Sequence, residues 1–157
     1  MRTHLTRLFL LTSVLSVIVL MESPTLAQRR GPKGRVYTRS EVNELIKRAE
    51  DRSDRFVKLF DHALDKSGLD GSKQEDRLNE RATELEKAMD DLRHEFDRKE
   101  SYVETKPEMI RVLNIASGIN QVMLNRRMGP NAEQSWAALR TELNILASVY
   151  YLPRLRP

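Results

Sequence analysis

The sequence predicts an all-α protein, an antiparallel helical bundle of about four helices. Three observations indicate this class. Apolar residues recur at alternating spacings of three and four, 32% of the residues are charged, and proline is sparse and confined to the ends of the periodic segments. We expect a long hairpin of helices at about 39–67 and 73–103, followed by a shorter hairpin at about 106–125 and 132–151.

The first helix is expected to begin after Thr38, which forms a capping box with Glu41. Its apolar stripe is broad enough for a bundle rather than a bare two-stranded coil. The stripe positions are Val42, Ile46, Ala49, Ser53, Phe56, Phe60 and Ala63. Gly68 is a plausible C-terminal cap, so the helix should end near residue 67.

The second helix is expected to begin at a second capping box, Ser72 with Glu75. Its stripe is a narrow, near-strict heptad seam of the coiled-coil type. The seam positions are Leu78, Ala82, Leu85, Met89, Leu92 and Phe96. This seam, next to the broad stripe of the first helix, would also suit a homodimer.

The shorter hairpin contains two more predicted caps. Thr105 with Glu108 is a third capping box, and Asn131 with Gln134 caps the last helix. The helix at 106–125 is apolar on most sides, so we expect it to be the most buried of the four.

The unequal hairpins predict a protruding tip. The first two helices would each span roughly 40–45 Å and the last two only about 28 Å. The apolar residues at the tip would then pack on each other or meet a partner. They form the first part of a candidate interaction surface: Phe60, Leu64, Leu69 and Leu78.

The N-terminus resembles a secretory signal peptide at residues 1–27. Arg2 and Arg7 precede an uncharged apolar run at 8–21, and small residues before the expected cut after Ala27 suit a signal peptidase. The run is short for a membrane span, which needs about 20 residues. We therefore expect export to the periplasm or the exterior, with anchoring by an uncleaved segment as the alternative.

A basic arm at 28–37 is expected to be disordered, because glycine, proline and basic residues alternate there without an apolar period. It completes the candidate interaction surface with Arg29, Arg30, Lys33 and Arg35. Such an arm suits an anionic membrane or a wall polymer, and we expect no nucleic-acid partner. The bundle domain then spans 38–152, and 153–157 is a short basic tail.

The sequence offers little chemistry, since cysteine is absent and metal-ligand spacing is missing around His62 and His94. Residues 65–71 do not match the ligand order of a calcium-binding EF-hand loop and are interpreted as a polar turn. Carboxylate clusters alternate with basic residues, as on a helix surface held by ion pairs. We therefore predict no catalytic, cofactor-binding or metal-binding residues and no cofactor.

These observations predict an exported, non-enzymatic helical protein of the cell envelope. It would act through contacts with an unidentified protein partner, as an adaptor or structural module. The alternative is a periplasmic helical chaperone or stress-type binder that holds unfolded clients on the apolar tip residues.

Overall fold

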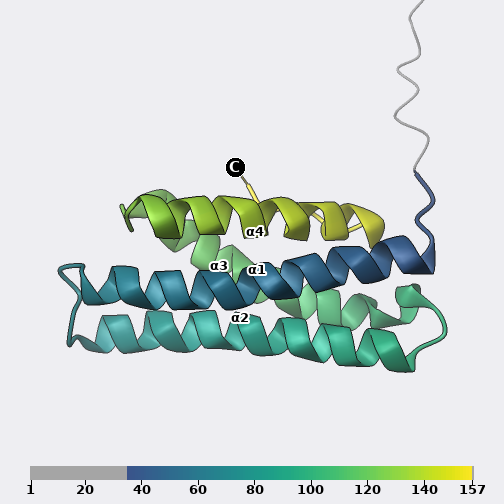
Figure 1. Ribbon diagram of the computed structural model, residues 1–157, viewed down its shortest axis with the longest axis horizontal. Coiled ribbons are helices and arrows are strands. Elements are labelled where there is room, and N and C mark those ends of the chain that lie inside the picture. Colours follow the sequence, from purple (N-terminus) through teal and green to yellow (C-terminus); the bar gives the residue numbers. More distant parts are fainter. Residues whose placement is uncertain (1–34, 157) are drawn as a thin grey trace, which may run out of the picture. The chain divides into compact units, whose positions relative to one another are not determined.

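The computed structural model describes residues 35–156, and from Val36 onward these form one four-helix unit (Figure 1). The elements in chain order are α1 (Arg39–Asp65), α2 (Lys73–Arg98), the short 3-10 helix η1 (Tyr102–Thr105), α3 (Lys106–Asn125) and α4 (Pro130–Val149). The predicted all-α bundle of four helices is confirmed. The predicted signal peptide and most of the basic arm lie outside the described residues.

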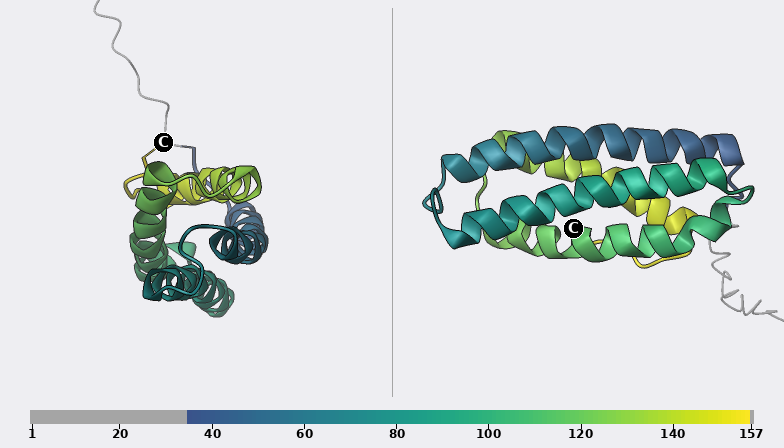
Figure 2. Two further views of the ribbon diagram at one scale, coloured as in Figure 1. Left: turned by 90° about the vertical axis from the view of Figure 1, so that its left-hand side faces the viewer. Right: turned by 90° about the horizontal axis from the view of Figure 1, so that it is seen from below.

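Each helix runs antiparallel to the next, and α4 returns beside α1 (Figure 1). α1 packs on both α2 and α4, and α2 packs on α3. α3 runs diagonally behind α1 and meets α4 less extensively. Seen end-on, the four helices enclose a common core (Figure 2).

The core follows the predicted apolar stripes closely. Val42, Ile46, Phe56 and Phe60 of α1 are fully buried, and the α2 seam from Ala82 onward is buried as well. An aromatic group joins α1 to α4, because the ring of Phe56 lies 5.0 Å, centroid to centroid, from the rings of both Phe60 and Trp136. Burial of these large rings is a major source of the bundle's stability.

The α3 helix is not the most buried one, contrary to the prediction. It buries seven of its 20 residues, whereas α4 buries nine of 20. Ile110 and Leu124 of α3 keep 41% and 54% of their surface exposed. The reason is position: among residues 35–156 no further helix covers the outer side of α3, so part of its apolar surface is exposed within the described unit.

The first two predicted N-terminal caps are present. Thr38 and Glu41 form the full capping box. Ser72 accepts a hydrogen bond from the Glu75 amide at 3.2 Å, but the Glu75 carboxylate turns instead to the Gly71 amide at 2.6 Å. Gly71 has a φ of +70°, which glycine adopts without strain, so the turn before α2 is tightly closed.

The other two predicted caps do not form as expected. Thr105 is the N-cap residue of α3, which begins at Lys106 as predicted, but its side chain makes no capping hydrogen bond. A capping box four residues earlier, between Ser101 and Glu104, starts η1 instead. Thr105 is then free to bond the buried Tyr150 hydroxyl at 2.8 Å. At α4 the capping position is Gly129 rather than Asn131, because Pro130 already has the backbone angle of a first helical turn.

The prediction of a protruding tip is also wrong. Phe60 and Leu64 are completely buried, and Leu69 and Leu78 are partly buried against the core. The loop between α3 and α4 covers this end, with Met128 only 5% exposed. The length estimate considered helices alone and left out these loop residues, which extend the shorter hairpin toward the turn between α1 and α2.

The C-terminal residues fold back on the bundle rather than extending from it (Figure 2). After α4 the chain reverses at Tyr151, which has a φ of +55°, and the Leu152 amide bonds the Ala147 carbonyl at 2.7 Å. The side chain of Asn144 then bonds both the amide and the carbonyl of Leu155, at 2.7 and 3.2 Å. The segment predicted as a separate tail is therefore part of the packed unit.

Replacing Gly118 in the middle of α3 by alanine is expected to stabilise the protein by up to about 1 kcal/mol, because alanine is the better helix former. The new Cβ would lie 3.0 Å from a terminal nitrogen of Arg81, whose side chain is about half exposed and can shift aside. Urea unfolding followed by circular dichroism measures the change. A loss of stability would show instead that the Arg81 guanidinium is held in place.

Candidate interaction surfaces

The predicted tip surface does not exist as an exposed patch. Phe60 and Leu64 face the core, and only Leu69 and Leu78 keep part of their surface accessible. Of the predicted basic residues, Arg35 is described and exposed. Arg29, Arg30 and Lys33 lie outside the described residues, so their role stays a prediction.

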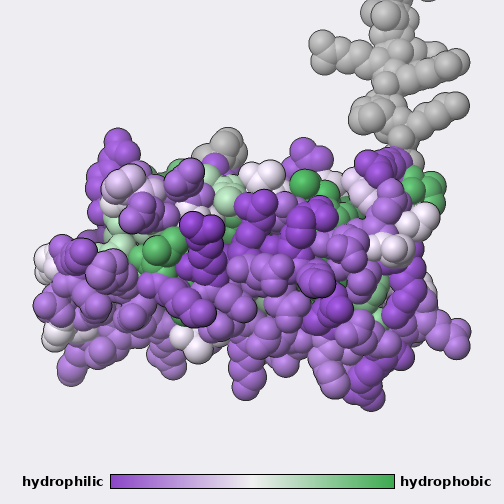
Figure 3. Space-filling view, in the orientation of Figure 1, coloured by the Kyte–Doolittle hydropathy of each residue, from purple (hydrophilic) through white to green (hydrophobic). Residues whose placement is uncertain are grey.

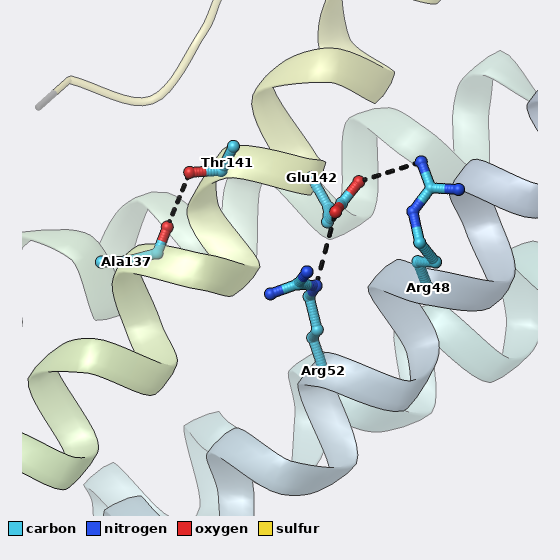
Figure 4. Close-up of polar contacts among 5 residues, drawn as sticks. All are labelled: Arg48, Arg52, Ala137, Thr141 and Glu142. Carbon is cyan, nitrogen blue, oxygen red and sulfur yellow. Dashed lines mark hydrogen bonds and ion pairs between the residues drawn. The ribbon is translucent and has the colours of Figure 1, made fainter.

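A buried carboxylate ties α4 to α1. Glu142 is 7% exposed, and its two oxygens lie 3.4 Å from Nη2 of Arg48 and 3.4 Å from Nε of Arg52 (Figure 4). The neighbouring Thr141 hydroxyl bonds back to the Ala137 carbonyl of its own helix at 2.8 Å. Because both oxygens of Glu142 are paired, we assign this residue a structural role.

Four carboxylates form an acidic seam where α1 and α2 lie side by side: Glu50, Asp54, Glu86 and Asp90. Desolvation is the largest cause that raises the pKa of Glu50, Glu86 and Asp90. Glu50 and Glu86 are half-buried, whereas Asp90 lies at the exposed margin of the seam. The charge of Asp54 raises all three further, while Arg93 and Lys58 act in the opposite direction on Glu50 and Glu86 respectively. None of the four seam carboxylates makes an ion pair with another of residues 35–156.

The seam predicts a pH effect on stability. A carboxyl whose pKa is higher in the folded state than in the unfolded state binds its proton more tightly in the folded protein. This proton binding stabilises the fold fully at pH values below the pKa of the unfolded state, and the stabilisation is lost as the pH rises through the pKa of the folded state. At pH 7 the charged seam therefore costs stability. We expect Asp90→Asn to raise Tm by about 2 °C at pH 7, since charges near the surface are worth less than about 1 kcal/mol, and by less at pH 4.

Thermal unfolding at both pH values tests this expectation. Glu80→Gln is the matched control, because Glu80 is an exposed acid of α2 outside the seam. If the two substitutions change Tm equally at both pH values, the charged seam does not lower stability more than an exposed acid elsewhere on α2 does.

A second surface lies between α3 and the returning C-terminal residues. It is a groove of about 530 Å³ lined by Ile110 and Leu124 of α3 and by Leu152, Arg154 and Arg156 of the C-terminal segment. The shape of this groove could not be predicted from local sequence patterns, because it depends on the reversal at Tyr151 and on the hydrogen bonds made by Asn144.

An adjoining cavity of about 390 Å³ lies at the corner where α3 meets α4. It shares Leu124 with the groove and is lined by Arg126, Arg127, Arg140 and Trp136. The two hollows are further connected because Nη1 of Arg140 lies 3.4 Å from the Arg156 carbonyl. We call the joint surface the arginine face. Its basic members are Arg126, Arg127, Arg140, Arg154 and Arg156, and its one acidic lining residue is Glu133.

Neither histidine is part of a catalytic arrangement in the described part of the chain, since His62 and His94 are exposed on different helices. At the turn between α1 and α2, oxygens of Asp65, Asp70 and Glu75 lie within 4.8 Å of one another. One oxygen of Glu75 already bonds the Gly71 amide, and Ca²⁺ takes six to eight oxygens. We therefore assign the three carboxylates to the structure of the turn.

None of the helices among residues 35–156 has both the length and the apolar content needed to cross a membrane. Comparisons with protein-family models, with curated proteins and with solved structures give no match to this chain.

Proposed function

We propose that this protein is an exported, non-enzymatic adaptor of the cell envelope, and that it binds a protein partner through the acidic seam. The observation that carries this proposal is the charge crowding between α1 and α2. Besides desolvation, the charge of Asp54 raises the pKa of the other three seam carboxyls and that of Asp90 raises those of Glu50 and Glu86, against the opposing charges of Arg93 on Glu50 and Lys58 on Glu86. None of the four seam carboxylates forms an ion pair with another described residue. A basic protein surface would relieve this repulsion on binding.

The surroundings of the seam suit a polar, solvated interface. The side of the bundle formed by α4, α1 and α2 presents mostly hydrophilic residues, with apolar residues in small groups only (Figure 3). Charge complementarity at such a surface governs partner selection and association rate more than it governs raw affinity. We therefore expect a partner whose binding weakens as salt increases.

The absence of enzymatic activity belongs to the same proposal. Glu142, one of two acids that are only 7% exposed, is paired with Arg48 and Arg52, and His62 and His94 are exposed on different helices. The chaperone alternative relied on an exposed apolar tip, and the burial of Phe60 and Leu64 removes the observation that favoured it.

The test is a comparison of three proteins, each spanning residues 28–157 and immobilised against an envelope extract. The first is unchanged, the second carries Glu86→Gln with Asp90→Asn, and the third carries Glu44→Gln with Glu80→Gln as a control of equal charge change at exposed positions. A protein retained by the first and third but lost from the second supports the proposal. Equal retention by all three, or retention by none, contradicts it.

Export is tested separately by the intact mass of the cellular protein. A mass that begins at Gln28 is expected from cleavage after Ala27. An intact Met1 on a protein that stays with the membrane fraction would favour the anchored alternative.

A further inference from the structure

We infer that the arginine face binds the phosphate head groups of an anionic phospholipid surface. This would be a second interaction, on the side of the bundle formed by α3 and the C-terminal residues. It is independent of the acidic seam and of the basic arm.

The charge distribution is the first argument. From residue 106 to 156 the chain has seven basic and three acidic residues. Two of the three acids are engaged within the fold. Glu142 lies beside Arg48 and Arg52 of α1, whereas Glu133 accepts from the Met128 amide at 3.2 Å and pairs with Arg127 of the arginine face at 3.7 Å. The basic charge of this half is therefore left largely uncompensated at the surface.

The second argument is how the arginines are held. Arg126, Arg140, Arg154 and Arg156 make no ion pair with any described residue. Arg154 donates only through Nε, to the Ser148 hydroxyl at 2.9 Å, which orients the guanidinium and leaves its two terminal amino groups for another acceptor. Guanidinium groups bind phosphate through paired hydrogen bonds, which a lysine amine cannot match.

The third argument is the apolar surface beside these charges. Ile110 and Leu124 are exposed along the groove, and Leu152 lines its opposite side. Next to Leu152 in the chain, Tyr151 is 79% exposed in a left-handed conformation that usually favours glycine. Exposed apolar and aromatic side chains beside arginines are typical of surfaces that lie in the head-group region of a bilayer.

The combination of arginines with exposed apolar side chains favours a lipid surface over a soluble phosphate compound. A free phosphate would use the arginines but would leave Ile110 and Leu124 in water. A bilayer would bind the guanidinium groups through head-group phosphates and would also cover the apolar residues between them. The groove, which has arginine and apolar lining together, suits this mixed environment.

The test uses residues 36–157, which contain the whole core, so that the leader and the basic arm do not contribute. Sedimentation is measured with vesicles of phosphatidylcholine alone and with vesicles that also contain phosphatidylglycerol. We expect binding to the mixed vesicles, little binding to phosphatidylcholine, and no competition by inorganic phosphate at matched ionic strength. Absence of binding to the mixed vesicles, or displacement by inorganic phosphate, would overturn the inference.

Variants then locate the binding surface. Arg126→Gln with Arg154→Gln is expected to weaken binding about tenfold or more, since each arginine near an anionic surface contributes substantially. The matched control is Arg55→Gln with Arg77→Gln, two exposed arginines of α1 and α2, which should change binding less than about twofold. An equal loss in both variants would show that net charge alone, rather than this face, is responsible.

A third variant addresses folding and the apolar contribution. Leu124→Ser changes an exposed side chain and leaves the charge unaltered, so it should weaken the binding that survives at high salt while leaving the circular dichroism spectrum unchanged. If Leu124→Ser binds as tightly as the unchanged protein at high salt, the apolar half of the inference fails.

Discussion

Phe56→Ala is expected to lower the free energy of unfolding by about 3–5 kcal/mol. Phe56 is fully buried, and its ring lies 5.0 Å from both Phe60 on the same helix and Trp136 on α4. Removal of this ring leaves a cavity between α1 and α4 and ends both aromatic contacts. The loss is a large share of the 5–15 kcal/mol that stabilises an ordinary domain.

Urea unfolding measures this loss, followed by circular dichroism and by the fluorescence of Trp136, the single tryptophan of the chain. Val57→Ala is the control, because Val57 is the next residue of α1 and is only partly buried. Phe56→Leu provides a milder change for the case in which the alanine variant does not fold. If Phe56→Ala lowers the free energy of unfolding no more than Val57→Ala does, this aromatic group is not a major source of the bundle's stability.

The burial of Phe56 could be predicted from sequence because helical periodicity is a local property. The stripe on α1 even included Ser53, a polar residue, and Ser53 is fully buried with its hydroxyl bonded to the Glu50 carbonyl at 2.8 Å. The core-facing side of α2 followed in the same way from its heptad seam. The helices and their antiparallel order could therefore be predicted from the sequence.

The predicted starts of α1, α2 and α3 match the structure, whereas the hydrogen bonds expected at each cap were predicted fully only at Thr38. At Thr38 nothing competes with the capping box, and it forms. Ahead of α3, two adjacent motifs begin at Ser101 and at Thr105, and only the first forms a capping box. Tertiary packing decides between them: Tyr102 meets Tyr150 edge to face at 6.0 Å, and Thr105 bonds the Tyr150 hydroxyl.

Both candidate surfaces depend on tertiary contacts, which the spacing of apolar residues along the sequence does not predict. The acidic seam requires the register of α1 against α2, although the acids themselves were visible in the sequence. The arginine face requires Asn144 to hold Leu155, so a segment that looked like a free tail becomes one wall of a groove. The tip was mispredicted for the same reason, since Met128 covers it from a loop that has no periodic pattern.

Asn120→Leu is expected to cost about 2–3 kcal/mol, because it leaves buried polar groups without partners. Asn120 is 4% exposed; its Oδ1 accepts from Nε1 of Trp136 at 3.0 Å, and its Nδ2 donates to the Arg156 carbonyl at 3.0 Å. Leucine has a similar volume but can replace neither hydrogen bond. The buried indole N–H of Trp136 would then lose its acceptor, while the chain end would lose one of its attachments to α3.

Two measurements separate these consequences. Urea unfolding gives the stability loss, with Asn114→Leu as the control, because Asn114 is an exposed asparagine of the same helix. Amide hydrogen exchange near Arg156 reports the loosened chain end, which should exchange faster in Asn120→Leu alone. Equal stability of the two variants, or unchanged exchange near Arg156, would mean that Asn144 holds the C-terminal segment without help from Asn120.

The result for hydrogen exchange also decides what to expect for lipid binding. If exchange near Arg156 is unchanged, the arginine face keeps its geometry in Asn120→Leu, and this variant should bind vesicles as the unchanged protein does. If exchange does accelerate, weaker vesicle binding should accompany it, because Arg154 and Arg156 lie on the loosened segment.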